Sequence, residues 1–260
     1  GTYRFLHMLI AEGLYEILPP AKRRELHARL GAAYEALSDS VLEPRQALIA
    51  HHYFRAGPDL YGRAISFSLN AGRSATQRGD PEEAVLHFER AVSALRETQG
   101  AGPELIDAMV DLGTAQTRAQ NTVGAREILM TAAGLARSAG EAQRFAEAAL
   151  AYANEVSVGS YQPESVALLE EGLEFLDGSE MRSPLYAGLL GRLANARSLR
   201  DEPELRAARA REAVSIARTT EDLAALAATL KDYHFCLMGV GSASMRRAIA
   251  DELYDLSASL

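Results

Sequence analysis

The sequence has one cysteine and no tryptophan, and only nine of its 260 residues are proline. A single cysteine excludes an internal disulfide framework and any metal site built from several thiolates. No apolar run approaches the roughly 20 residues that a membrane-spanning helix requires, and the first residues do not resemble a signal peptide. We therefore expect a cytoplasmic chain without membrane contact. Because the chain starts with Gly1 rather than methionine, we also expect a piece of a larger protein.

Motifs of catalysis and nucleotide binding are also lacking. The sequence contains no G-x-x-x-x-G-K-[ST], no G-x-G-x-x-G, no H-E-x-x-H and no G-x-S-x-G. These absences argue against NTP hydrolysis, dinucleotide binding, zinc proteolysis and serine-based acyl transfer. The formal net charge of −8 argues against non-specific nucleic-acid binding, because nothing offsets repulsion from the phosphates. We predict a non-enzymatic chain with no cofactor and no direct nucleic-acid contact.

The composition favours helices. Forty-seven residues are alanine and 25 of the 27 basic residues are arginine, both strong helix formers. All nine prolines fall at breaks between apolar-periodic segments, where a helix start tolerates proline. The pattern predicts an all-α chain with helices at 6–18, 20–37, 44–56, 60–78, 81–97, 103–119, 122–138, 141–157, 163–176, 183–200, 203–218, 221–238 and 243–258.

A pattern with a period of 40–41 residues runs through these segments. A small residue in one helix is followed, at fixed offsets in the next, by small, large and small residues. A phase kept over several units favours a solenoid over an alanine-rich bundle. Arg206 stands at a position where the pattern has a small residue. A fifth unit around Phe235 keeps the two helices but not the small, large, small spacing of the second one. The four phased units are Gly72 with Ala84, Phe88 and Ala91; Gly113 with Ala125, Leu129 and Ala132; Ala153 with Ser165, Leu169 and Gly172; and Ala194 with Arg206, Ala210 and Ala213.

The unit from Leu69 to Ala91 resembles a tetratricopeptide repeat, although that motif is 34 residues long. The resemblance implies a right-handed superhelical solenoid of helical hairpins. Residues 3–15 and 18–27 resemble the F-x-H-x-L-I-x-E-x-L-Y and L-P-P-x-x-R-x-x-L-H stretches of large bacterial signalling ATPases. Residues 50–53, Ala-His-His-Tyr, resemble part of their x-A-x-H-H-[FY] segment. Among these ATPases are the large ATP-binding LuxR-type transcriptional regulators. Adenylate cyclases and protein kinases share the same middle region, so both contexts stay open.

This resemblance implies a division of the chain at residue 57. Residues 1–57 would be the end of an upstream ATPase module with linking helices, and residues 58–260 an array of five hairpins. The array would be a sensor or interaction segment that binds an effector or a protein partner on its concave face and acts on its own upstream ATPase module. As the alternative, it would be an interaction scaffold of a cyclase or kinase.

Tetratricopeptide arrays line their concave face with fixed positions of each first helix, and in this chain those positions carry helix-neutral polar residues. Asparagine both donates and accepts hydrogen bonds, which suits an extended peptide or a small polar effector. The alternative is that small residues merely let neighbouring first helices approach closely. The predicted binding residues are Arg73, Thr76, Gln77, Thr114, Thr117, Arg118, Asn154, Ser157, Asn195 and Ser198.

Four other features have simple structural interpretations. His51 and His52 are neighbours on a helix and point about 100° apart, so they cannot chelate one ion together, and we predict no metal site. We expect His7 to be a packing residue and Cys236 a buried, inert thiol. We expect a solvated helix face for Arg206, Arg209, Arg211 and Arg218.

The last predicted helix carries an apolar face of Ile249, Leu253 and Leu256. An end repeat without a polar cap leaves such a face open. We therefore expect homo-oligomer formation through this end of the array.

Overall fold

The computed structural model describes residues 8–37, 45–98, 100–154, 161–176, 182–238 and 243–258. The chain divides into two compact units, Gly1–Ala108 and Met109–Leu260, which are considered separately below. Throughout the described residues the regular structure is helical, without a strand. The prediction of an all-α chain is therefore confirmed. None of the described helices is both long and apolar enough to cross a membrane.

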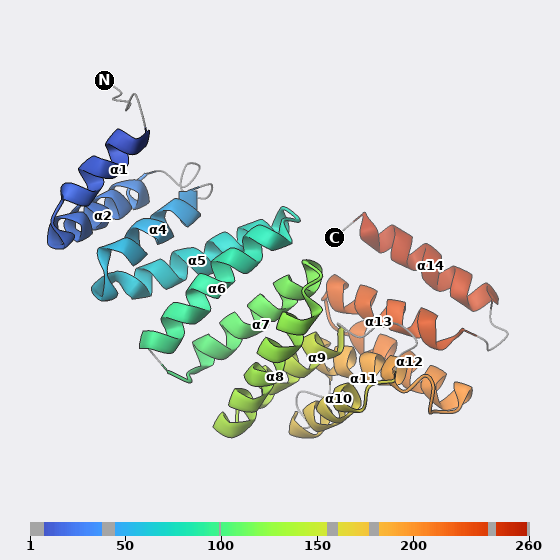
Figure 1. Ribbon diagram of the computed structural model, residues 1–260. Coiled ribbons are helices and arrows are strands. Elements are labelled where there is room, and N and C mark those ends of the chain that lie inside the picture. The colour runs from blue at the N-terminus through green and yellow to red at the C-terminus, as the bar shows by residue number, and fades with distance from the viewer. Residues whose placement is uncertain are drawn as a thin grey trace. The chain divides into compact units, whose positions relative to one another are not determined.

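Consecutive helices pack in pairs within each unit (Figure 1). The predicted helices are found within a few residues of their expected ends, and the largest difference is α11, which stops at Ala196 rather than at residue 200. His7 lies outside the described residues. The helices are α1 (Met8–Ile17), α2 (Pro20–Glu35), α4 (Gln46–Ala56), α5 (Tyr61–Gln77), α6 (Pro81–Thr98), α7 (Pro103–Arg118), α8 (Thr122–Ala139), α9 (Ala142–Asn154), α10 (Pro163–Phe175), α11 (Pro184–Ala196), α12 (Pro203–Ala217), α13 (Leu223–Cys236) and α14 (Ala243–Ser257), with a 3₁₀ turn, η2 (Pro58–Leu60).

Local sequence explains why the helices start where they do. Proline occupies the first turn of α2, α10, α11 and α12, where its missing N–H has no intrahelical partner. The side chains of Asn121 and Asp222 cap the starts of α8 and α13, and the side chain of Ser183 caps α11 beside its proline. Each accepts a hydrogen bond of 2.9–3.2 Å from the backbone N–H three residues later. These signals are short-range, which is why the breaks are readable from the sequence.

The two helices of a hairpin approach closely at the phased small residues. A Cβ atom placed on Gly72 would lie 2.6 Å from the Phe88 ring, and one on Gly113 would collide with Leu129. Only glycine permits this approach, and it lets Phe88 and Leu129 become almost completely buried, at 2% and 0% exposure. Ala84 is also fully buried, as its phase predicts. The period of about 40 residues therefore corresponds to one helical hairpin.

In the N-terminal unit the packing continues across residue 57. Ile49, Tyr53 and Ala64 share one buried cluster, so α4 and α5 pack directly on each other. A Cβ atom on Gly31 would lie 2.7 Å from the Tyr53 ring, which makes α2 and α4 a close pair of the same kind as the later hairpins. Whether residues 1–57 end an ATPase module in a longer protein stays a prediction.

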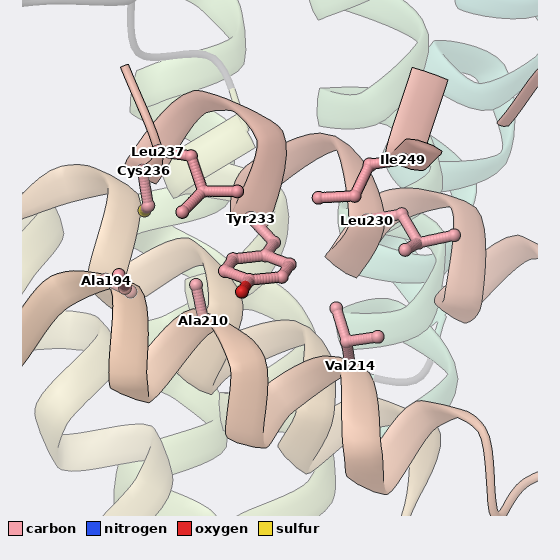
Figure 2. Close-up of a cluster of buried hydrophobic side chains, with 9 residues drawn as sticks. Ala194, Ala210, Val214, Leu230, Tyr233, Cys236, Leu237 and Ile249 are labelled. Atoms are coloured by element: carbon pink, nitrogen blue, oxygen red, sulfur yellow. The ribbon is translucent and has the colours of Figure 1, made fainter. Parts of the chain in front are cut away.

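In the C-terminal unit a cluster of buried apolar side chains joins α11, α12, α13 and α14, with Tyr233 at its centre (Figure 2). Ile249 of α14 is 5% exposed in this cluster, and Leu253 and Leu256 pack against it. The expectation that these three side chains form an open face is therefore wrong, because α14 folds back and turns that face onto α13. Cys236 is fully buried as expected, and burial raises the pKa of its thiol to about 12.

Arg206 connects two helices of the C-terminal unit. It donates to three backbone carbonyls, those of Ser198 at 2.7 Å, Met238 at 2.8 Å and Cys236 at 3.0 Å. It thereby joins the C-terminal ends of α11 and α13, where carbonyls lack intrahelical partners. The solvated-face expectation is therefore wrong for Arg206 and for the half-buried Arg209, which pairs with Asp201, whereas Arg211 and Arg218 are exposed as expected. Arg211 contacts the Tyr233 hydroxyl and Arg218 contacts Glu252.

Candidate functional site

The C-terminal unit contains a groove of about 570 Å³. Its walls come from α7, α9, α11 and α13, which are the first helices of four successive hairpins. This is the surface that the repeat phase assigns to the concave face. The lining residues are Val110, Thr114, Thr117, Arg118, Glu147, Leu150, Ala151, Asn154, Leu185, Arg192, Ala228 and Lys231.

Four of the predicted residues meet in this groove. Thr114, Thr117 and Arg118 line it from α7, and the exposed Asn154 lines it from α9. The Thr117 hydroxyl donates to the Gly113 carbonyl at 3.0 Å, so its donor is used within its own helix and its lone pairs stay available as acceptors. The structure brings these four residues together, and their role in binding stays a prediction.

Asn195 does not line the groove. Its side-chain Nδ2 donates to Oδ1 of Asp232 at 2.8 Å, and an Arg192 guanidinium nitrogen lies 3.3 Å from the same oxygen. Asp232 is 2% exposed; burial raises the pKa of its carboxyl, while Arg192 and Asn195 act in the opposite direction. The Asn195 amide therefore holds a buried carboxylate of α13, and the expectation that it faces a ligand is corrected.

Ser198 is also displaced from its expected place. Because α11 ends at Ala196, Ser198 lies in the following turn rather than one helical turn further along the groove. Its carbonyl accepts the hydrogen bond from Arg206. Ser157 lies outside the described residues.

The remaining predicted residues belong to α5 in the N-terminal unit. Arg73 and Gln77 are exposed there, and Thr76 is half-buried. The Thr76 hydroxyl donates to the Gly72 carbonyl at 2.9 Å, which repeats the Thr117 geometry one period earlier.

The solvent-accessible charges of the groove have a small positive excess. Its basic lining residues are Arg118, Arg192 and Lys231, but the buried Arg192 is paired with Asp232 at 3.3 Å. Arg118 and Lys231 therefore stand against one acidic lining residue, Glu147, whose carboxylate accepts a hydrogen bond from Gln143. The groove thus has one more solvent-accessible cation than anion within a chain whose formal charge is −8.

Sequence reasoning missed Arg192, Lys231 and Glu147. The predicted residues lie near the end of each first helix, whereas the groove also reaches Glu147 in the second turn of α9 and Ala228 and Lys231 in the middle of α13. The same repeat phase, applied about two turns earlier in each first helix, would have identified Glu147.

No protein-family model matches the chain, and no curated protein matches it in sequence. Solved structures do match. The nearly identical TPR-like repeats of a kinesin light chain-like protein from Podosopora anserina superpose with a TM-score of 0.55 at 17% identity, covering 75% of this chain and 95% of that one. BtubC (BKLC) from P. vanneervenii gives a TM-score of 0.60 at 16% identity, covering 90% of this chain and 91% of that one.

The fold is a tetratricopeptide-like solenoid. At these identities the likeness establishes the fold alone, and it confirms the tetratricopeptide part of the prediction. Affiliation with LuxR-type regulators stays a prediction.

Proposed function

We propose that the chain is a non-enzymatic interaction segment whose groove binds an extended, acidic segment of a protein partner. One observation carries this proposal: four successive first helices build one groove, and two exposed basic residues, Arg118 and Lys231, line it against one acidic residue, Glu147, while Arg192 is paired with Asp232. An acidic partner matches that charge, whereas a basic partner would be repelled.

The groove also offers the contacts that an extended chain needs. Neighbouring helices pack about 10 Å apart, so a strand that rises about 3.3 Å per residue passes one helix every third residue. The exposed Asn154 amide is suited to donating to and accepting from a peptide backbone. Arg118 and Lys231 are suited to carboxylates, and the half-buried Val110 and Leu150 offer apolar contact. Backbone hydrogen bonds would supply affinity and the basic side chains the preference for acidic residues.

We place this segment within a cytoplasmic ATP-dependent LuxR-type regulator. The support is the likeness of residues 3–34 and 50–53 to the segments that close the ATPase module in those proteins. Binding in the groove would change how the array packs on the upstream ATPase. The domain order of the full-length gene tests this context: a helix-turn-helix encoded downstream supports it, and a cyclase or kinase domain replaces it with the alternative.

A peptide-display selection on the purified chain tests the groove. A random library should enrich peptides with several Asp or Glu residues. The enriched peptides should fail to bind a variant that combines Asn154→Ala, Arg118→Gln and Lys231→Gln. The matched control is Arg247→Gln, since Arg247 has an 85% exposed side chain on α14, outside the groove. Enrichment without an acidic bias, or equal binding to the triple variant, would overturn the proposal.

A further inference from the structure

Three histidines gather in the N-terminal unit, away from the groove. His27 comes from α2, and His51 and His52 come from α4. One ring nitrogen of each lies within 4.8 Å of the corresponding nitrogens of the other two, and the Nδ1 atoms of His27 and His52 are 2.9 Å apart. We propose that His27, His51 and His52 form a binding site for a divalent transition metal, with Zn²⁺ as the ion that fits best.

The third histidine removes the geometric objection to this site. The sequence argument considered only the two neighbours on α4, which point in different directions from one helix. His27 enters from the facing helix, with its ring centroid 5.1 Å from that of His52 and 6.0 Å from that of His51. All three rings therefore border one space between α2 and α4.

The distances suit zinc. Zn–N bonds of about 2.0–2.1 Å at tetrahedral angles place ligand nitrogens about 3.3 Å apart. The separations here, from 2.9 Å to within 4.8 Å, span that value, so small ring rotations bring the three nitrogens onto one ion. Imidazole is a ligand of Zn²⁺, Cu²⁺ and Ni²⁺ rather than of Mg²⁺ or Ca²⁺. Three protein ligands leave a fourth position for water or an exogenous ligand.

Neighbouring aromatic residues orient the rings. The Tyr15 hydroxyl lies 3.0 Å from Nε2 of His27, on the far side of the ring from Nδ1. If Nε2–H donates to this hydroxyl, Nδ1 is unprotonated and faces the other two histidines, which is the arrangement of a metal-bound imidazole. The Tyr34 ring stacks on His52 at 5.8 Å with an interplanar angle of 8°.

The electrostatic surroundings keep the imidazoles neutral. Partial burial is the largest cause that lowers the pKa of each of the three histidines, and neutral imidazole is the form that binds metal. Arg55 and Arg90 also contribute positive charge and oppose a cation, but both are exposed and therefore screened by salt.

One ligand of the site is accessible from solvent. His51 is exposed and lines a hollow of about 410 Å³, whose charged lining residues are Arg55, Arg90 and Glu97. This third ligand therefore lies at the solvent side of the cluster.

Metal titration of the untagged, metal-stripped chain tests the site. Isothermal titration with Zn²⁺ should give one ion per chain with a dissociation constant at or below the micromolar range. Co²⁺ should give the visible absorption of a tetrahedral site, and saturating Zn²⁺ should raise Tm, because binding to the folded state stabilises it. His51→Gln should weaken binding at least 100-fold, and Tyr15→Phe about 10- to 100-fold. His234→Gln, in α13 of the other unit, should bind like the wild type.

His51→Gln is the decisive variant, because His51 is exposed and its replacement leaves the packing of α2 on α4 intact. His27→Gln is the second variant, with circular dichroism as the check that it folds. The proposal is overturned if the wild type binds no metal. It is also overturned if His51→Gln and folded His27→Gln bind as tightly as the wild type, in which case the hydrogen bond between His27 and His52 is a packing contact only.

Discussion

Asn195 and Asn154 occupy equivalent repeat positions, yet alanine should destabilise the protein at only one of them. The Asn195 side chain donates at 2.8 Å to Asp232, whose side chain is 2% exposed. Leaving a buried polar group without one of its hydrogen-bond partners costs about 1–3 kcal/mol. We therefore expect Asn195→Ala to lower the free energy of unfolding by about 2 kcal/mol. Asn154 is exposed on the groove, and Asn154→Ala should stay within about 0.5 kcal/mol of the wild type.

Urea unfolding followed by circular dichroism measures both effects. With a slope of about 2 kcal/mol per molar urea, Asn195→Ala should move the midpoint down by about 1 M. Repeat arrays can unfold in parts, so hydrogen exchange of α11 and α13 should show the same loss locally. Asn195→Ala should cost much less in an Asp232→Asn background, because the carboxylate that it serves is then absent.

The reasoning fails if the two alanine variants are equally stable, or if Asn154→Ala is the more damaging one. It also fails if the loss from Asn195→Ala is the same with and without the Asp232 carboxylate. Either result would mean that the Asn195 amide does not act through Asp232.

Three further predictions concern the hairpin core, the arginine bridge and acid sensitivity. Phe88→Ala should lower the free energy of unfolding in urea by about 3–5 kcal/mol, whereas Leu86→Ala, on the exposed side of the same helix, should lower it far less. A loss under about 1 kcal/mol for Phe88→Ala would contradict the repeat phase. Arg206→Leu should lower the free energy of unfolding by about 2–3 kcal/mol, since three backbone carbonyls lose a charged donor, and Arg247→Leu should be neutral. Burial lowers the pKa of His87 in the folded chain, so the unfolded chain binds the proton more readily and stability should fall as pH drops below about 6.5. Tm at pH 7.5 and 5.5 measures this fall, and His87→Gln should reduce it.

The helices and their pairing were predictable because their signals are local or strictly periodic. Proline and capping residues mark the starts, and each pair of a small and a large residue, such as Gly72 with Phe88, is separated by 16 residues. The phase also predicted which helices line the groove, and it placed Thr117, Arg118 and Asn154 there. Because the same spacing recurs in each repeat, the packing of one hairpin predicts the packing of the next.

The partners of individual polar side chains were not predictable in the same way. Asn195 and Asp232 are 37 residues apart, and Arg206 and Met238 are 32 apart. Repeat phase predicts the face on which a residue lies, but not which neighbour its side chain reaches. The histidine cluster was missed for this reason, since His27 meets His52 only because α2 packs on α4. Ser198 likewise lies beyond the end of α11 at Ala196, where its carbonyl accepts a hydrogen bond from Arg206 of the next helix.

The central claim is that the groove between α7, α9, α11 and α13 binds an extended acidic segment. The most direct measurement is the dissociation constant of a display-selected acidic peptide at low and at physiological salt. For the wild type and for Arg247→Gln we expect equal affinity that weakens as salt rises, and for the triple groove variant a loss of at least 100-fold. Affinity that is independent of salt and unchanged by the groove substitutions would contradict the claim.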